Sequence, residues 1–110
     1  MRRRYPDTDV NELMMQLFNL LSYRPAEILG ISSHKGGLAQ GKHADFIVWN
    51  PFAQYKVEKS NVYGSFRDCS PFPGSELEGV VMRTYVRGAP TYINGRFTPN
   101  GKIFNRNNLL

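Results

Sequence analysis

The sequence of 110 residues lacks the features that identify disulfide-rich, membrane-spanning and secreted proteins. Its one cysteine, Cys69, excludes an internal disulfide framework and fits a reducing compartment such as the cytoplasm. No stretch approaches the roughly 20 apolar residues that a membrane-spanning helix needs. The arginines at residues 2–4 are not followed by the apolar segment of a secretory signal. We therefore expect a cytoplasmic chain without a membrane partner, and the isolated chain is expected to be marginally stable or only partly folded.

The sequence also lacks the common motifs of hydrolytic sites. Its two histidines, His34 and His43, form neither an H-x-H nor an H-E-x-x-H pair, so loop histidines are favoured over metal ligands. Cys69 with a histidine base lacks a nucleophile motif and fits a small hydrophobic residue better. Asp45 and Asp68 have no diagnostic acid–base spacing, and Asp45 fits a hydrogen bond to backbone amides at a strand entry. We predict no catalytic, cofactor-binding or metal-ligating residue in this chain.

Signals for nucleic acid or phosphate are equally weak. The net charge is +5, but the basic run at residues 2–4 is short and favours a solvated terminus. The aromatic residues show no pattern of an RNA-stacking sheet. Gly36, Gly37 and Gly41 precede a predicted strand rather than a helix N-terminus, so they are expected to supply turn positions with positive φ.

A helical period dominates the first third of the chain. Asp9 is a candidate N-cap with Glu12 at the capping-box spacing, which predicts a helix over residues 10–22. Pro25 is predicted to end this helix and to open a short second one through residue 28 or 29, which Gly30 caps. The first helix carries a wide apolar stripe made of Val10, Leu13, Met14, Leu17, Phe18, Leu20 and Leu21. A stripe this wide in a short chain predicts a packing partner outside it.

After Gly30 the spacing of apolar residues changes from that of a helix to that of β-strands. Residues 46–49 are continuously apolar, which predicts a strand covered on both faces and ended by Asn50-Pro51. Residues 55–58 are predicted to form a half-exposed strand and residues 59–75 a loop. The longest predicted strand spans residues 77–87, with Val80, Met82, Thr84 and Val86 on one face and Val81, Arg83, Tyr85 and Arg87 on the other. Turns at Gly88-Ala89 and Asn94-Gly95 predict that residues 90–93 and 96–97 pair back onto it.

Four segments, in order, resemble the C-terminal part of the amidohydrolase superfamily. Residues 36–51, GGLAQGKHADFIVWNP, resemble the signature G-x-[IL]-x-x-G-x-x-A-D-[FLI]-[VI]-[VI]-[WF]-[DN]-P. Residues 20–31, LLSYRPAEILGI, residues 70–79, with SPFPG, and residues 80–97, with TYVRG, resemble further segments of its cyclic amidohydrolase branch. Together they cover about residues 10–104. The SPFPG and TYVRG segments are most similar to allantoinases, then to dihydroorotases, and less to dihydropyrimidinases.

The resemblance implies a mixed α/β fragment. Residues 1–31 would be the end of the catalytic barrel, its last helix and a short following helix. Residues 32–104 would be the C-terminal part of a composite β-sandwich domain, and residues 105–110 a tail. The barrel core itself needs roughly 250 residues and is expected to be absent.

The resemblance also implies an activity for a full-length relative. Such an enzyme opens the ring of allantoin to give allantoate, in purine catabolism. It uses two divalent metals, expected to be zinc, held by histidines, a carboxylated lysine and an aspartate, all upstream of the matching segments. Family members are commonly homotetramers. We therefore expect a non-catalytic chain whose partner is the missing barrel portion or an intact amidohydrolase.

Alternatives remain open at this point. The corresponding part of a dihydroorotase or a dihydropyrimidinase is the first alternative. A non-catalytic module that binds an amidohydrolase, or itself, through open sheet edges is a second class of function. A small basic nucleic-acid-binding protein is a third, and it requires an affinity that falls steeply with salt. Arg83, Tyr85 and Arg87 are candidate contacts to a neighbouring subunit.

Overall fold

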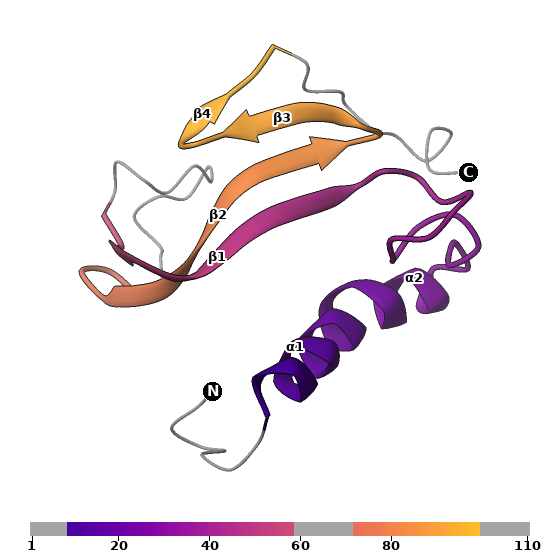
Figure 1. Cartoon of the computed structure of the whole chain (residues 1–110), viewed down its shortest axis with the longest axis horizontal. Helices are drawn as coiled ribbons and strands as arrows, with labels where there is room; N and C mark the ends of the chain where they lie inside the picture. The colour runs from indigo at the N-terminus through magenta and orange to yellow at the C-terminus, as the bar shows by residue number, and fades with distance from the viewer. Residues whose placement is uncertain (1–8, 59–71, 100–110) are drawn as a thin grey trace. The chain divides into compact units, whose positions relative to one another are not determined.

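The computed structural model describes residues 9–58 and 72–99 (Figure 1). In chain order its elements are α1 (Val10–Phe18), the π-helix η1 (Asn19–Tyr23), α2 (Arg24–Ile28), β1 (Phe46–Lys56), β2 (Glu76–Val86), β3 (Ala89–Ile93) and β4 (Arg96–Phe97). Described residues up to Asp45 belong to one compact unit, and those from Phe46 onward belong to a second. Cys69, Asp68, the basic run at residues 2–4 and the tail at residues 105–110 lie outside the described residues.

Helix α1 begins where the sequence predicts, but without the predicted capping box. Asp9 occupies the N-cap position, and its backbone oxygen accepts a hydrogen bond of 3.1 Å from the N–H of Leu13. The Asp9 side chain makes no capping hydrogen bond. The helix start is therefore held by the backbone, and the capping-box prediction for Asp9 and Glu12 is wrong.

Pro25 does not break the helix, contrary to prediction. Arg24, the residue before it, keeps helical backbone angles of φ −62° and ψ −43°, and α1, η1 and α2 follow one another directly. In a regular α-helix the proline ring would meet the carbonyl four residues back, and it has no N–H to donate. The helical turn before Pro25 is wider instead, because the N–H of Arg24 donates to the oxygen of Asn19, five residues back. The π turn thus accommodates the proline.

The helical segment ends at Gly30, as predicted. The N–H of Gly30 donates to Glu27 at 3.0 Å, and the N–H of Ile31 donates to Ala26 at 2.9 Å. This pair of bonds with a left-handed residue, here Gly30 at φ 71°, is the Schellman motif. Ala26 and Ile31, whose backbones the second bond joins, are both buried.

The apolar stripe of the helix is covered in its first half and bare in its second. Leu13 is buried at 4% exposure, and Val10 and Leu17 are half-buried. Leu20 and Leu21 are 65% and 71% exposed. The predicted packing partner outside the chain stays a prediction. Among the described residues, no helix is long and apolar enough to cross a membrane.

Strand β1 runs through the Asn50-Pro51 stop signal, so two predicted strands are one. Asn50 pairs with Val80 and Gln54 with Glu78, which leaves three residues of β1 opposite the single residue Gly79. The Asn50 side chain accepts a hydrogen bond of 3.0 Å from the N–H of Phe52 within this irregularity. The turn signal is therefore real, but it produces a bulge rather than an end.

The remaining sheet follows the prediction except at its first turn, which lies at Arg87-Gly88 rather than at Gly88-Ala89, so the long strand ends at Val86. All pairs are antiparallel in the order β1-β2-β3-β4, as Figure 1 shows. Arg87 and Gly88, at φ 49° and 79°, make the first two-residue turn, and Asn94 and Gly95, at φ 46° and 87°, make the second. Positive φ at both central residues is the requirement of the hairpin turns that match strand twist.

Exposure alternates along the middle of β2. Val80, Met82 and Thr84 are half-buried, and Val81 and Arg83 are exposed, in agreement with the predicted alternation, but Tyr85 on the second face is half-buried as well. In β1, Ile47 is 56% exposed and Trp49 is 36% exposed, so the prediction of a strand covered on both faces is wrong. A strand is covered on both faces only where a layer packs on each side of its sheet, and the described residues of this unit form a single sheet.

Candidate functional site

The segment between α2 and β1 holds both histidines of the chain, and we call residues 31–45 the histidine loop. It lies directly against the helical segment at Gly36. A Cβ atom built on Gly36 would meet the Cβ of Ala26 at 2.6 Å and the backbone oxygen of Ser22 at 3.2 Å. Gly36 also has a φ of 85°, and Gly41 has a φ of 87°, so the predicted positive-φ turn positions are confirmed at these two glycines.

The structure brings the two histidines together. Their ring centroids are 5.2 Å apart with an interplanar angle of 58°. The backbone N–H of His43 donates to the oxygen of His34 at 2.8 Å, and Ser33 Oγ shares a hydrogen bond of 3.0 Å with His34 Nδ1. The sequence was weighed for a pair of metal-ligating histidines and favoured two loop histidines, but it did not predict this contact between the rings. The glycines between them were the available signal, because a tight turn folds its two arms back on each other.

Lysine side chains connect the two halves of the histidine loop, before and after its glycine turn. Lys35 Nζ donates to the Asp45 carboxylate in an ion pair whose side chains are 15% and 31% exposed. Lys42 Nζ reaches the backbone oxygen of Lys35 at 3.5 Å and lies 5.9 Å from the centroid of the Tyr23 ring. These contacts were not predicted. The expected hydrogen bond from backbone amides to Asp45 stays a prediction.

The chemistry open to this loop is limited. Two imidazoles supply fewer donors than the three or four protein ligands of a zinc centre. Over residues 9–58 and 72–99, no three His, Cys, Asp or Glu side chains gather at one point. The predicted combinations of Cys69 with a histidine and of Asp45 with Asp68 include residues outside the described ranges. The contacts described above are within the loop and between the loop and the helical segment, so they support a structural role for the loop.

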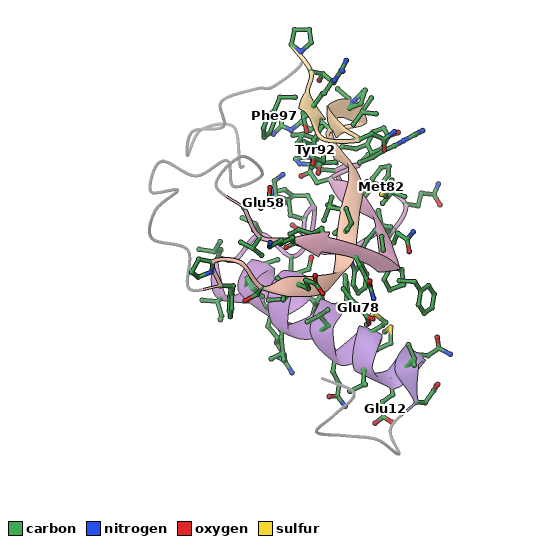
Figure 2. All side chains as sticks on the ribbon, turned by 90° about the vertical axis from the view of Figure 1, so that its left-hand side faces the viewer. Glu12, Glu58, Glu78, Met82, Tyr92 and Phe97 are labelled. Atoms are coloured by element: carbon green, nitrogen blue, oxygen red, sulfur yellow. The ribbon has the colours of Figure 1, made fainter. Side chains whose placement is uncertain are left out.

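The candidate subunit contact on β2 does not form one face. Tyr85 stacks on Phe46, with ring centroids 4.6 Å apart and an interplanar angle of 14°. Arg87 lies in the turn after β2 with positive φ, so it is not on the strand face with Arg83. At the other edge, Tyr92 and Phe97 pack edge to face at 5.4 Å, and both are labelled in Figure 2. The sheet aromatics thus pair with one another across strands.

Comparisons with known proteins connect this arrangement to one family. Residues 1–97 match the Amidohydrolase family. The chain is 34% identical over 82 residues to an allantoinase of Arabidopsis thaliana, covering 74% of this chain and 16% of that protein. It is 39% identical over 88 residues to a dihydroorotase of Thermoanaerobacter sp. (strain X514), covering 80% and 20%. A solved D-hydantoinase structure matches with a TM-score of 0.68 at 29% identity, covering 74% and 18%. The chain therefore spans a fifth or less of each relative.

Proposed function

Since the chain belongs to the amidohydrolase family, we propose that it forms the C-terminal part of a hydrolase that opens a cyclic amide. The observation that carries this proposal is the match over residues 1–97, together with relatives named allantoinase, dihydroorotase and D-hydantoinase. The likeness in fold to a D-hydantoinase supports the same placement. In the reaction, water adds to the amide carbonyl, the ring C–N bond breaks, and the nitrogen leaves with a proton.

Allantoin is the substrate we propose, with allantoate as product. The SPFPG and TYVRG segments support this choice, as does the similarity to the Arabidopsis thaliana allantoinase. A dihydroorotase is the alternative, and it is supported by the higher identity of 39%. The similarity to D-hydantoinases keeps the dihydropyrimidinase type within the same proposal, although the sequence alone ranked it lower.

We propose that the chain itself does not catalyse the reaction. Members of the family are generally metal-dependent, and a two-metal centre needs a converging set of histidine and carboxylate donors. The donors in the described residues do not fit such a centre, so we assign no catalytic step to them. Two divalent metals, zinc by expectation, would be held by the barrel portion of the whole enzyme.

The proposed partner is this barrel portion, in the same protein or in an intact amidohydrolase. Strand β1 supports the proposal because its edge can pair with strands of the partner. It is an edge strand among the described residues, and Ile47 and Phe52 on it are 56% and 80% exposed. An open edge with exposed apolar side chains favours pairing with further strands. The same surface supports the alternative of a non-catalytic module that binds an intact amidohydrolase.

A chimera tests the proposed function. The matching C-terminal segment of the Arabidopsis thaliana allantoinase is replaced by residues 10–97 of this chain, and hydrolysis of allantoin is measured. A parallel chimera uses the Thermoanaerobacter dihydroorotase and its own cyclic substrate. We expect activity in the allantoinase chimera and none in the isolated chain with added zinc. Two chimeras that fold, bind metal and remain inactive would contradict the placement. Activity of the dihydroorotase chimera alone would move the substrate to the alternative.

A further inference from the structure

The proposed function leaves the contact between His34 and His43 unexplained. These are the two histidines of the whole chain, and their ring centroids lie 5.2 Å apart at an interplanar angle of 58°. Both residues are half-buried, so each ring is held by its surroundings and can still be reached from solvent. Imidazole is the commonest protein ligand of transition metals. Two such rings in contact within one loop are therefore a candidate chelating pair.

The distance between the rings matches that of two imidazoles on one tetrahedral ion. A zinc–nitrogen bond of about 2.0–2.1 Å places the centroid of a ligating imidazole about 3.2 Å from the ion. Two ligands at the tetrahedral angle then bring their centroids about 5.2 Å apart. The angle of about 90° in square-planar or octahedral sites would require about 4.5 Å. The observed separation of 5.2 Å fits the tetrahedral case.

Backbone hydrogen bonds hold the two histidines next to each other. The N–H of His43 donates to the oxygen of His34 at 2.8 Å, and the N–H of His34 donates to the buried Ile31 at 3.2 Å. Just before His43, the N–H of Lys42 donates to the oxygen of Ala39 at 3.1 Å and closes a turn. These bonds fix the backbone of both histidines before an ion binds, so binding does not have to order the loop.

The neighbours of the rings indicate which nitrogens would bind. Ser33 Oγ shares a hydrogen bond of 3.0 Å with Nδ1 of His34. When Nδ1 donates this bond, Nε2 carries the lone pair, as in metal-bound histidines whose second nitrogen is held by an outer partner. Nδ1 of His43 is buried, so Nε2 is the nitrogen that an ion from solvent reaches. We therefore assign Nε2 of both rings as the ligands.

The charges near the pair set the strength of such a site. Lys35 is engaged by the Asp45 carboxylate, which offsets its positive charge. The Lys42 ammonium lies 3.5 Å from the backbone oxygen of Lys35 and 5.9 Å from the centroid of the Tyr23 ring, and it still opposes a bound cation. Two imidazoles beside a lysine bind an ion more weakly than the four protein ligands of a structural zinc site. The ion would accordingly exchange with solvent.

We propose that His34 and His43 bind one Zn²⁺ ion as a two-imidazole site, with water in the other two positions. The ion would connect the two halves of the histidine loop beside their backbone hydrogen bond. Because an ion that binds only the folded loop adds its binding free energy to folding, it would also stabilise the loop against the helical segment. This inference goes beyond the proposed function, and it depends on neither the substrate nor the barrel portion.

Calorimetric titration of the full chain with zinc chloride tests the site. The sample carries no histidine tag and contains Cys69→Ser, because a thiolate is itself a zinc ligand. We expect one ion per chain. His34→Gln and His43→Gln each keep a polar side chain but remove a zinc ligand, so each should weaken binding at least about tenfold, the lower end of the loss when an outer partner of a ligand is removed.

Leu38→Gln is the matched control for both variants. Leu38 lies in the same loop, is 74% exposed and receives the same new side chain. We expect it to leave the zinc affinity unchanged. Saturating zinc should also raise the urea midpoint of the parent chain and of Leu38→Gln, but not of the two histidine variants. Circular dichroism confirms that each variant keeps its helix.

Cobalt(II) tests the geometry of the same site. A tetrahedral Co²⁺ ion absorbs visible light far more strongly than an octahedral one. We expect strong absorption with the parent chain and with Leu38→Gln, and its loss in His34→Gln and His43→Gln. Ser33→Ala should keep the spectrum but weaken binding by up to about tenfold, because the His34 ring loses its outer partner and not a ligand.

Four results would overturn the proposal. A full chain that takes up no zinc has no such site. Binding that Leu38→Gln and the two histidine variants weaken equally belongs to other donors. Half an ion per chain assigns the metal to histidines of two copies and not to one loop. Weak visible absorption of the cobalt form removes the tetrahedral arrangement that the ring separation indicates.

Discussion

The helical segment with its histidine loop and the β-sheet keep their shapes by different means. The first has three buried apolar residues, Leu13, Ala26 and Ile31, and a partly buried ion pair. The described part of the second unit has one, Val57, which directly follows β1, and it otherwise depends on backbone pairing and on aromatic contacts across strands. A loop fixed by side chains is sensitive to single contacts. A sheet that buries few apolar side chains within its own unit is sensitive to what packs against it.

The largest expected effect concerns the stability of the whole chain. We expect a free energy of unfolding below about 5 kcal/mol for the monomer, the lower end for natural domains, because the sheet buries little apolar surface. Hydrogen exchange should show faster exchange in β1 than in α1. A single cooperative thermal transition with uniform protection would contradict this expectation.

Gly36→Ala should be the most damaging single change in the helical unit. It combines a left-handed backbone, at roughly 1–2 kcal/mol, with a 2.6 Å clash against Ala26 at roughly 1–3 kcal/mol. We expect a loss of about 2–4 kcal/mol, measured by urea denaturation and helical circular dichroism.

Gly41→Ala is the matched control for that variant. Gly41 has nearly the same φ, but an added Cβ meets nothing within 4 Å. We expect a loss of about 1 kcal/mol from backbone conformation alone. Equal losses at Gly36 and Gly41 would show that the contact with the helix does not matter.

Gly79→Ala tests the corresponding close contact in the sheet. The added Cβ would lie 2.9 Å from the Trp49 indole, opposite the bulge in β1, at a φ of 102°. We expect a loss of about 2 kcal/mol and a red shift in the fluorescence of this single tryptophan as the ring moves toward water. Gly95→Ala, where nothing lies within 4 Å, serves for comparison. An unshifted emission maximum would mean that the ring does not pack on Gly79.

Lys35→Met should have a smaller effect than Gly36→Ala or Gly79→Ala. The substitution removes the partly buried ion pair and leaves the Asp45 carboxylate with one fewer donor, a loss of about 1–2 kcal/mol. A double-mutant cycle with Asp45→Asn isolates the coupling between the two side chains. Additive losses would indicate that the arms of the loop are held by the backbone bond between His34 and His43 alone.

Predictability from sequence also differs between the two regions. The hairpins were predictable, because Asn94-Gly95 encodes its turn in the two residues that form it. The π turn was not, since whether Pro25 ends a helix or widens it depends on packing beyond its neighbours. The same holds for Asn50-Pro51, where pairing with β2 continues past a local turn. The Lys35–Asp45 pair and the adjacent histidines required the three-dimensional path of the loop.

The π turn at Asn19–Tyr23 has a consequence for how this helix can vary in length. A wide turn holds more residues than an α-helical one, so it accommodates a residue that a regular helix would not. Loss of one residue there would return the segment to a regular α-helical period, while the residues after the turn would largely keep their orientation because the wide turn holds the extra residue locally. A deletion in the regular part of α1 would instead rotate the following residues by about 100°, the angular step of a helix with 3.6 residues per turn. A one-residue gap at Asn19–Tyr23 in an aligned relative is therefore compatible with an unchanged helix end.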